Sequence, residues 1–194
     1  MNFLAHIYLS GDNDLIKIGN FMADGIHGHD YLQLPNEVIK GVLLHRAIDT
    51  FTDAHPIFRQ SKHRLHIGYG HYSGVVMDIL YDHFLAKNWP NYSNEKLEDF
   101  AANFYESLKT NYPIVTERTK EMMPHMIAGN WLVMYATIEG IGDILFQMDQ
   151  RTKNQGNMKT ATKELHLYYT EFEDEFTLFF EELRQHCREK LATL

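Results

Sequence analysis

Apolar residues recur at intervals of three or four along almost the whole chain, and this helical spacing constrains the fold more than any other feature. Runs rich in Val, Ile and Thr with alternating polarity, which are typical of strands, do not occur in the sequence. With 194 residues the chain is long enough to bury a substantial core as one domain. The pattern therefore predicts an all-α fold, a single-domain helical bundle over residues 1–194.

Glycine, proline and polar residues divide this pattern into helices. Asp12 and Asn36 are the expected N-caps of the second and third helices, and residues 25–35 and 154–157 are expected to break the helical pattern. The last helix carries an aromatic stripe that we assign to the core, with Cys187 near its end as a structural residue. The expected helices cover residues 2–9, 13–24, 37–54, 56–66, 73–88, 94–111, 114–127, 130–150 and 158–191.

Charge and cysteine content exclude several classes of protein. A net charge of −8 argues against generic nucleic-acid binding, which needs a basic face. The single cysteine, Cys187, excludes an internal disulfide framework and a cysteine-based zinc cluster, and it fits a reducing compartment. Because the sequence shows neither a secretory signal nor an apolar run of the roughly 20 residues that span a bilayer, we expect no membrane association and a cytoplasmic location.

Two ionisable side chains interrupt the apolar stripe of the third expected helix. This stripe advances by four, three, four and three residues through Val38, Val42, His45, Asp49 and Thr52. A buried charge is costly unless it is paired or bound to a metal. The i, i+4 spacing directs His45 and Asp49 to the same side, so they form either an ion pair or part of a metal site.

The expected helix over 73–88 shows the same anomaly with two carboxylates. Asp78 and Asp82 lie one turn apart on a stripe that includes Ile79, while His83 is rotated by about 100°. Two inward carboxylates repel each other, which raises the pKa of one of them unless a cation neutralises the pair.

Asp24, beside glycines, and His6, on the same helical face as Phe3, add two further polar groups near apolar positions. Each pair alone is explained by an ion pair or a solvated histidine. Their coincidence favours a metal site instead, because oxygen and imidazole donors suit Mn²⁺, Mg²⁺, Fe²⁺ or Zn²⁺.

The sequence resembles the acyl carrier protein phosphodiesterase family over nearly its full length. That family is in turn distantly similar to the histidine-aspartate (HD) phosphohydrolases, so the resemblance implies an HD-phosphohydrolase-like helical bundle. The resemblance is carried by five segments: MNFLAH at 1–6, GNFMAD at 19–24, GVLLHRAIDTFTDAHP at 41–56, MDILYDHFLAKNW at 77–89 and NWLVMY at 130–135.

This resemblance implies an activity: removal of 4′-phosphopantetheine from holo acyl carrier protein, a partner in fatty acid biosynthesis, by hydrolysis of its phosphodiester link to a serine, with Mn²⁺ as the usual metal. It assigns functional positions to Asp24, His45, Asp49, Asp78, Asp82 and His83, with His6 as a further member. Our hypothesis is that Asp82 or His83 orients the water or protonates the leaving serine oxygen. The remaining residues, Asp24, His45, Asp49, Asp78 and His6, are then expected to hold one or two metals.

Carrier proteins of this kind are acidic, as is this chain, so a local basic surface is needed for docking. The expected docking residues are Arg59, Lys62 and Arg64, with His63 between them as part of the same patch, although a solvated helix explains them equally well. Arg46, next to His45, is expected to reach the phosphate.

Two other functions remain open from the sequence. One is a phosphohydrolase acting on a nucleotide or another small phosphoester, because the metal chemistry does not select the substrate. The other is a carrier-binding protein without catalytic activity.

Overall fold

The computed structural model describes residues 1–153 and 155–194, and helices make up its regular structure. No strand occurs in these two ranges, so the prediction of an all-α fold is confirmed. The α-helices are α1 (Phe3–Tyr8), α2 (Asp14–Met22), α3 (Asn36–Ala54), α4 (Pro56–Tyr69), α5 (Ser73–Lys87), α6 (Leu97–Thr110), α7 (Glu117–Ala128), α8 (Trp131–Met134), α9 (Ile138–Arg151), α10 (Thr162–Leu167) and α11 (Tyr169–Thr193). Short 3₁₀ turns connect them: η1 (Ala23–Gly25), η2 (Asp30–Gln33), η3 (Gly70–Tyr72), η4 (Trp89–Asn91), η5 (Tyr112–Ile114) and η6 (Met158–Thr160).

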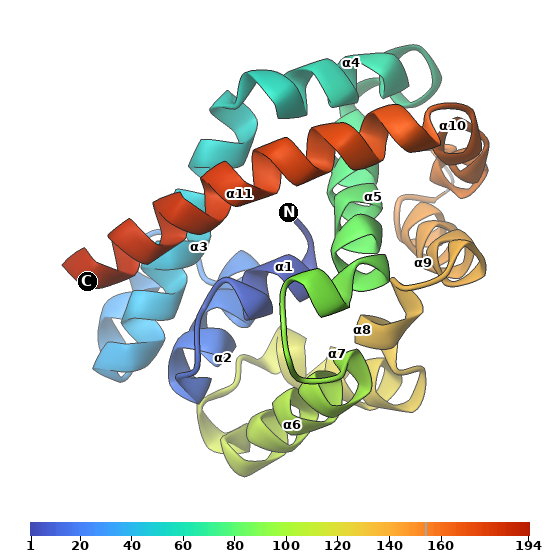
Figure 1. The fold of residues 1–194 in the computed structure, drawn as a ribbon. Coiled ribbons are helices and arrows are strands. Elements are labelled where there is room, and N and C mark those ends of the chain that lie inside the picture. The colour runs from blue at the N-terminus through green and yellow to red at the C-terminus, as the bar shows by residue number, and fades with distance from the viewer. Residues whose placement is uncertain (154) are drawn as a thin grey trace.

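The long helix α11 crosses α3, α4 and α5 and packs against all three (Figure 1). Its buried side chains are mainly aromatic, including Phe172, Phe176 and Phe179, which confirms that the aromatic stripe belongs to the core. Cys187 is buried on the same helix, and burial raises the pKa of its thiol to about 12. Such a thiol is unreactive at neutral pH, in agreement with a structural role.

Helix α5 forms the centre of the molecule. Residues 79–86 are all buried, so this helix is enclosed on every side and not on one stripe. It contacts α1, α4, α9 and α11. Asp82 and His83 are therefore both inside the protein, although they lie on different faces of the helix.

Helices α2 and α3 touch backbone to backbone at two glycines. A Cβ atom at Gly19 would lie 2.2 Å from the carbonyl oxygen of Val38, and one at Gly41 would lie 2.2 Å from that of Ile16. No side chain fits at either distance, so only glycine allows this approach. The contact brings Asn20 of α2 directly against His45 of α3.

Two expected N-caps were wrong. The side-chain oxygen of Asn13, and not that of Asp12, accepts from the backbone of Leu15 and Ile16 at the start of α2. Helix α3 begins at Asn36 itself, with Pro35 in the capping position and no side-chain cap. In both cases the cap lies one residue from the expected position, which is the usual uncertainty at a helix end.

Two long expected helices are interrupted. The range 130–150 divides into α8 and α9 because Thr137 is extended and its hydroxyl caps α9 by accepting from Gly140. Gly140 also lies so close to the carbonyl oxygen of Met134 that a Cβ would be 2.1 Å away. The range 158–191 divides into η6, α10 and α11, with Tyr168 leaving the helical conformation. Residue 154 of the expected polar break lies outside the described residues.

None of the helices in the described ranges combines the length and the apolar character that crossing a bilayer requires.

Candidate active site

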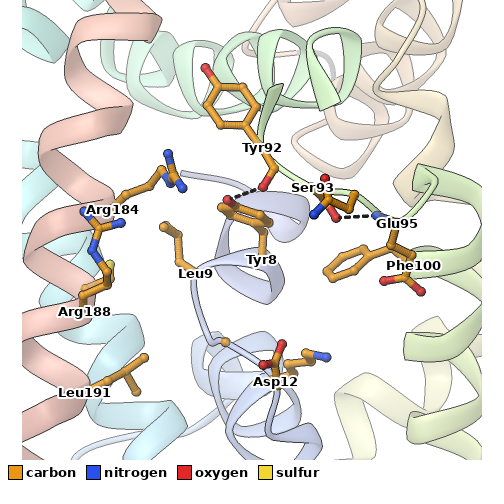
Figure 2. Close-up of a pocket in the computed structure, with 14 residues that line it drawn as sticks. Tyr8, Leu9, Asp12, Tyr92, Ser93, Glu95, Phe100, Arg184, Arg188 and Leu191 are labelled. Carbon is orange, nitrogen blue, oxygen red and sulfur yellow. Dashed lines mark hydrogen bonds between the residues drawn. The ribbon is translucent and has the colours of Figure 1, made fainter. Parts of the chain in front are cut away.

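One cleft of about 410 Å³ lies between the end of α1, the η4 turn and α11 (Figure 2). Tyr8 and Tyr92 form its aromatic wall, joined by a hydrogen bond from the Tyr8 hydroxyl to the Tyr92 carbonyl at 2.9 Å. Arg184 and Arg188 of α11 flank the cleft. None of the site residues predicted from the sequence lines this cleft.

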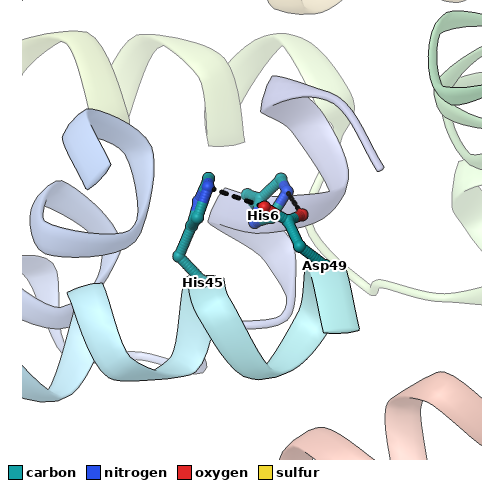
Figure 3. Close-up of side chains that lie close together, drawn as sticks. All are labelled: His6, His45 and Asp49. Carbon is teal, nitrogen blue, oxygen red and sulfur yellow. Dashed lines mark ion pairs between the residues drawn. The ribbon is translucent and has the colours of Figure 1, made fainter. Parts of the chain in front are cut away.

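His6, His45 and Asp49 come together between α1 and α3 (Figure 3). One ligand atom from each residue can be chosen so that all three atoms lie within 4.8 Å of one another. The Nε2 atoms of His6 and His45 lie 3.4 and 3.1 Å from the two carboxylate oxygens of Asp49, and the His45 Nε2 is also 3.2 Å from Asp24 Oδ1. Four of the predicted metal ligands are therefore neighbours.

Asn20 fixes the orientation of both imidazoles. Its amide nitrogen donates to the His6 carbonyl and to Ser10, so its Oδ1 is the atom that faces the rings. His6 Nδ1 lies 2.7 Å from this Oδ1, and His45 Nδ1 lies 2.9 Å from the Asn20 carbonyl oxygen. Because both partners are acceptors, both Nδ1 atoms carry a proton, which leaves Nε2 for a ligand in the neutral tautomer.

The charges of the cluster are strongly coupled. Burial lowers the pKa of His45, but its hydrogen bonds to Asp24 and Asp49 raise it to about 9. Burial also lowers the pKa of His6, and the nearby His45 charge lowers it further. Burial tends to raise the pKa of Asp49, yet its contacts with the two histidines hold it well below its usual range. A proton on His45 thus satisfies the two carboxylates when no metal is bound.

The same geometry fits a divalent metal. Two neutral imidazoles would point the lone pairs of Nε2 at carboxylate oxygens, and this arrangement is repulsive unless a proton or a cation lies among them. Two imidazole nitrogens with carboxylate oxygens form a donor set that suits Mn²⁺, Fe²⁺ or Zn²⁺. The Asn20 contacts to the far side of each ring are the supporting bonds typical of metal-binding histidines. His6, His45, Asp49 and Asp24 are therefore the residues that would hold a metal.

A cleft of about 330 Å³ opens beside this cluster. Asp24, Asp49 and Asp78 of α5 all contribute to its lining. Asp78 Oδ1 accepts a hydrogen bond from the Met1 amino group at 2.8 Å. Asp78 thus shares the cleft, but among the described residues neither it nor Asp24 is part of the group within 4.8 Å, and Asp24 joins the cluster through its contact with His45.

Comparison with known proteins bears on this arrangement. The family model described as "Acyl carrier protein phosphodiesterase" matches residues 1–183. The chain belongs to this family. Curated relatives with the same description include proteins from Photorhabdus laumondii, 29 % identical over 98 % of this chain and 96 % of the relative, and Yersinia pestis, 28 % identical over 98 % and 99 %. A relative from Escherichia coli is 26 % identical over 98 % of this chain and 99 % of the relative.

Membership of the acyl carrier protein phosphodiesterase family confirms the resemblance seen in the sequence, and with it the prediction that the chain is a hydrolase of the phosphodiesterase class. No solved structure matches the chain. The expected likeness to HD phosphohydrolases therefore stays a prediction.

Asp82, predicted to be catalytic in this family member, is engaged elsewhere. Its side chain is fully buried, and its oxygens accept hydrogen bonds from the backbone of Asn2, Leu4 and Ala5 at 3.2, 2.8 and 3.3 Å. Asp82 thus fixes the first turn of α1, the helix that carries His6. The structure gives it contacts to the helix that carries His6 and no opening to the cleft.

His83, the other residue predicted to be catalytic, points away from the cluster. Its Nδ1 lies 2.8 Å from the Tyr135 carbonyl oxygen and its Nε2 lies 3.0 Å from the Tyr169 hydroxyl. Burial lowers the pKa of His83, so it is neutral at physiological pH. These contacts join α5 to the α8–α9 connection and to α11, and they leave no ring atom for a substrate.

The predicted substrate-binding residues are spread over two regions. Arg46 donates to the Gly28 carbonyl at 2.8 Å and stacks on Tyr31, so it holds the connection between α2 and α3. On α4, Arg64 forms a two-pronged ion pair with Glu175, which neutralises it. Two further predicted docking residues of α4, Arg59 and Lys62, have no carboxylate partner within the described ranges. Arg59 donates to the Asp53 carbonyl, and Lys62 lies over the Phe58 ring.

Three residues of the site were missed by reasoning from the sequence. Asn20 lies within the segment GNFMAD, so the resemblance contained a signal for it that residue chemistry alone does not give. Arg118 and Arg151 line the cleft next to Asp24, but both are exposed residues that do not themselves interrupt an apolar stripe of α7 or α9. Only the folded arrangement brings them to the site.

Proposed function

We propose that this chain hydrolyses the phosphodiester that joins 4′-phosphopantetheine to a serine of holo acyl carrier protein, and that it requires a divalent metal, Mn²⁺. The products are the apo carrier and phosphopantetheine. One observation carries the metal requirement: Asn20 holds both His6 and His45 with Nε2 directed at carboxylates. The carrier substrate is supported by the descriptions of the curated relatives.

In this proposal His6, His45, Asp49 and Asp24 hold the metal. A bound divalent ion acidifies a water and withdraws charge from the phosphoryl oxygens. Asn20 keeps both imidazoles in the required tautomer, and Asp82 holds the start of α1 so that His6 stays in place. Asp78 faces the same cleft and is placed to exchange a proton with the leaving serine oxygen; burial raises its pKa, and the Met1 amino group paired with its Oδ1 lowers it.

Docking of the acidic carrier is assigned to Arg59 and Lys62 of α4. Arg59 donates to the carbonyl oxygen of Asp53, a residue that lines the cleft, so this end of α4 lies near the cluster. Arg64 is excluded from the docking face because Glu175 already neutralises it. A cytoplasmic location belongs to the same proposal.

The test is a substrate comparison with Mn²⁺ present throughout. Holo carrier, a cyclic nucleotide and a small aryl phosphodiester are each incubated with the protein, and the products are separated and identified. Release of phosphopantetheine from the carrier, much faster than turnover of the other two, supports the proposal. Turnover of the nucleotide alone indicates a small-molecule phosphohydrolase, and turnover of none indicates a binding protein.

A further inference from the structure

Two arginines from different helices meet beside the metal-binding cluster. Arg118 lies near the start of α7 and Arg151 is the last residue of α9. Both line the cleft of about 330 Å³ described above, and both line a second cleft of about 320 Å³. The two clefts also share Asp24 and Phe3. The arginines therefore belong to the lining that both clefts have in common, together with the predicted metal ligand Asp24.

Arg118 is attached to the turn that carries Asp24. Its Nη1 donates to the Asp24 carbonyl oxygen at 3.4 Å, and its aliphatic part packs next to Gly25. This long hydrogen bond uses only one of the five N–H groups of a guanidinium. The remaining donors are available to a molecule in the cleft.

Arg151 is positioned by packing and not by charge. Its guanidinium lies over the Trp131 ring, 5.5 Å from the ring centre, and its Nη1 donates to the weakly accepting sulfur of Met148 at 3.8 Å. Within residues 1–153 and 155–194, neither Arg151 nor Arg118 has an Asp or Glu partner within 4.0 Å. By contrast, Arg64 and Arg184 are each paired with a glutamate.

The negative charge of the cleft of about 330 Å³ explains why cations are needed there. Four carboxylates line it, those of Asp24, Asp49, Asp53 and Asp78. A phosphodiester carries a negative charge and would be repelled by this surface. The Met1 amino group in the lining is already paired with Asp78. A bound metal would offset a further part of the repulsion, and the two arginines are the cationic side chains in the lining that can offset the rest.

We propose that Arg118 and Arg151 bind the non-bridging oxygens of the substrate's phosphodiester, an inference that rests on the proposed function for the identity of that substrate. Guanidinium groups match the phosphate geometry with paired hydrogen bonds, and such charge-assisted bonds are stronger than those between neutral groups. The site is thus made of two halves: α1, η1 and α3 hold the metal, and α7 and α9 hold the phosphate.

The experiment replaces each arginine with methionine, which keeps much of the length and removes the charge. Arg188→Met is the matched control, because Arg188 is an arginine that lines the separate cleft of Figure 2. We expect kcat/KM for holo carrier to fall at least about tenfold in Arg118→Met and in Arg151→Met. Mn²⁺ affinity and helical circular dichroism should stay at the wild-type level, as should every property of the control.

A second measurement separates this inference from the proposed function. Inorganic phosphate is titrated calorimetrically into the Mn²⁺-loaded wild type and the three variants. Phosphate affinity at least about tenfold weaker in the two cleft variants, with the control unchanged, supports the arginine site even if the wild type does not hydrolyse the carrier. Unchanged phosphate affinity and unchanged turnover in both cleft variants overturn it, as does a wild type that neither binds phosphate nor turns over the carrier.

Discussion

The imidazole rings of His6 and His45 stack with their centres 4.2 Å apart, and both turn Nδ1 toward Asn20. Stacked cationic rings would repel each other, so at most one of the two carries a full charge in the absence of a metal. The pKa values agree, since that of His45 is raised to about 9 and that of His6 is lowered. One asparagine thus presents two imidazole nitrogens to the same small space.

Replacing Asn20 with alanine removes this control of the tautomers. We expect Mn²⁺ affinity to fall by about 10- to 100-fold, because a lost supporting contact lets the ligand rings rotate. Stability should also fall by about 1–3 kcal/mol, since the buried His6 carbonyl and ring nitrogens lose partners. Calorimetric titration with Mn²⁺ and urea unfolding measure the two effects. Asn103→Ala, at an exposed asparagine, is the control; equal Mn²⁺ affinity in both variants would show that Asn20 has no such role.

The contact between α2 and α3 is tested by Gly41→Ala. A methyl group there would lie 2.2 Å from a backbone oxygen, so the helices must separate, and we expect a loss of at least about 2 kcal/mol together with weaker Mn²⁺ binding. Gly142→Ala is the matched control in α9, where the added methyl meets only the Thr162 side chain at 3.8 Å. That change should be neutral or stabilise the protein by up to about 1 kcal/mol. Thermal unfolding of both variants decides, and equal melting temperatures would contradict the close contact.

The charge on His45 predicts how the metal-free protein responds to pH. Its pKa in the folded protein, about 9, lies above the ordinary 6.5, so the stabilisation by protonated His45 is complete below about pH 6.5 and is lost as the pH rises through about 9. Urea unfolding with a chelator present should show this decline. The variant His45→Asn should lack it, and a wild-type curve as flat as that of the variant would refute the charge assignment.

A metal must displace the same proton from His45. Between about pH 6.5 and 9 the apparent Mn²⁺ affinity should therefore rise, by up to about tenfold per pH unit. Calorimetry in buffers with different ionisation enthalpies counts the protons released. If binding at pH 7 releases no proton, the metal does not occupy the position of the His45 proton.

Asp82→Asn distinguishes the catalytic role expected from the sequence from the positioning role seen in the structure. If Asp82 fixes the start of α1, the variant should lose about 1–2 kcal/mol of stability and should bind Mn²⁺ more weakly, through displacement of His6. Burial raises the pKa of Asp82 to about 7. If the residue acts only on the proton, turnover should fall while Mn²⁺ affinity and unfolding stay unchanged.

The sequence was sufficient to predict the fold class and the closeness of His45 and Asp49, and the physical reason is local. His45 and Asp49 are four residues apart on one helix, so their spacing alone places them on one face. The sequence could not show that Asp82 faces the backbone of α1, because a polar residue in an apolar stripe indicates burial but does not indicate which group it contacts. The sequence also could not show which way His83 points, because α5 is enclosed on all sides and its stripe does not separate an inner face from an outer one.

The central claim is tested most directly by the intact mass of holo carrier after incubation with the chelator-treated protein, with and without added Mn²⁺. We predict that the carrier loses the mass of phosphopantetheine only when Mn²⁺ is added, and that His45→Ala, with normal helical circular dichroism, leaves the carrier unchanged. His166→Ala, at an exposed histidine of α10, should act as the wild type does. A carrier whose mass stays constant with the wild type and Mn²⁺, or falls equally with His45→Ala, would contradict the account.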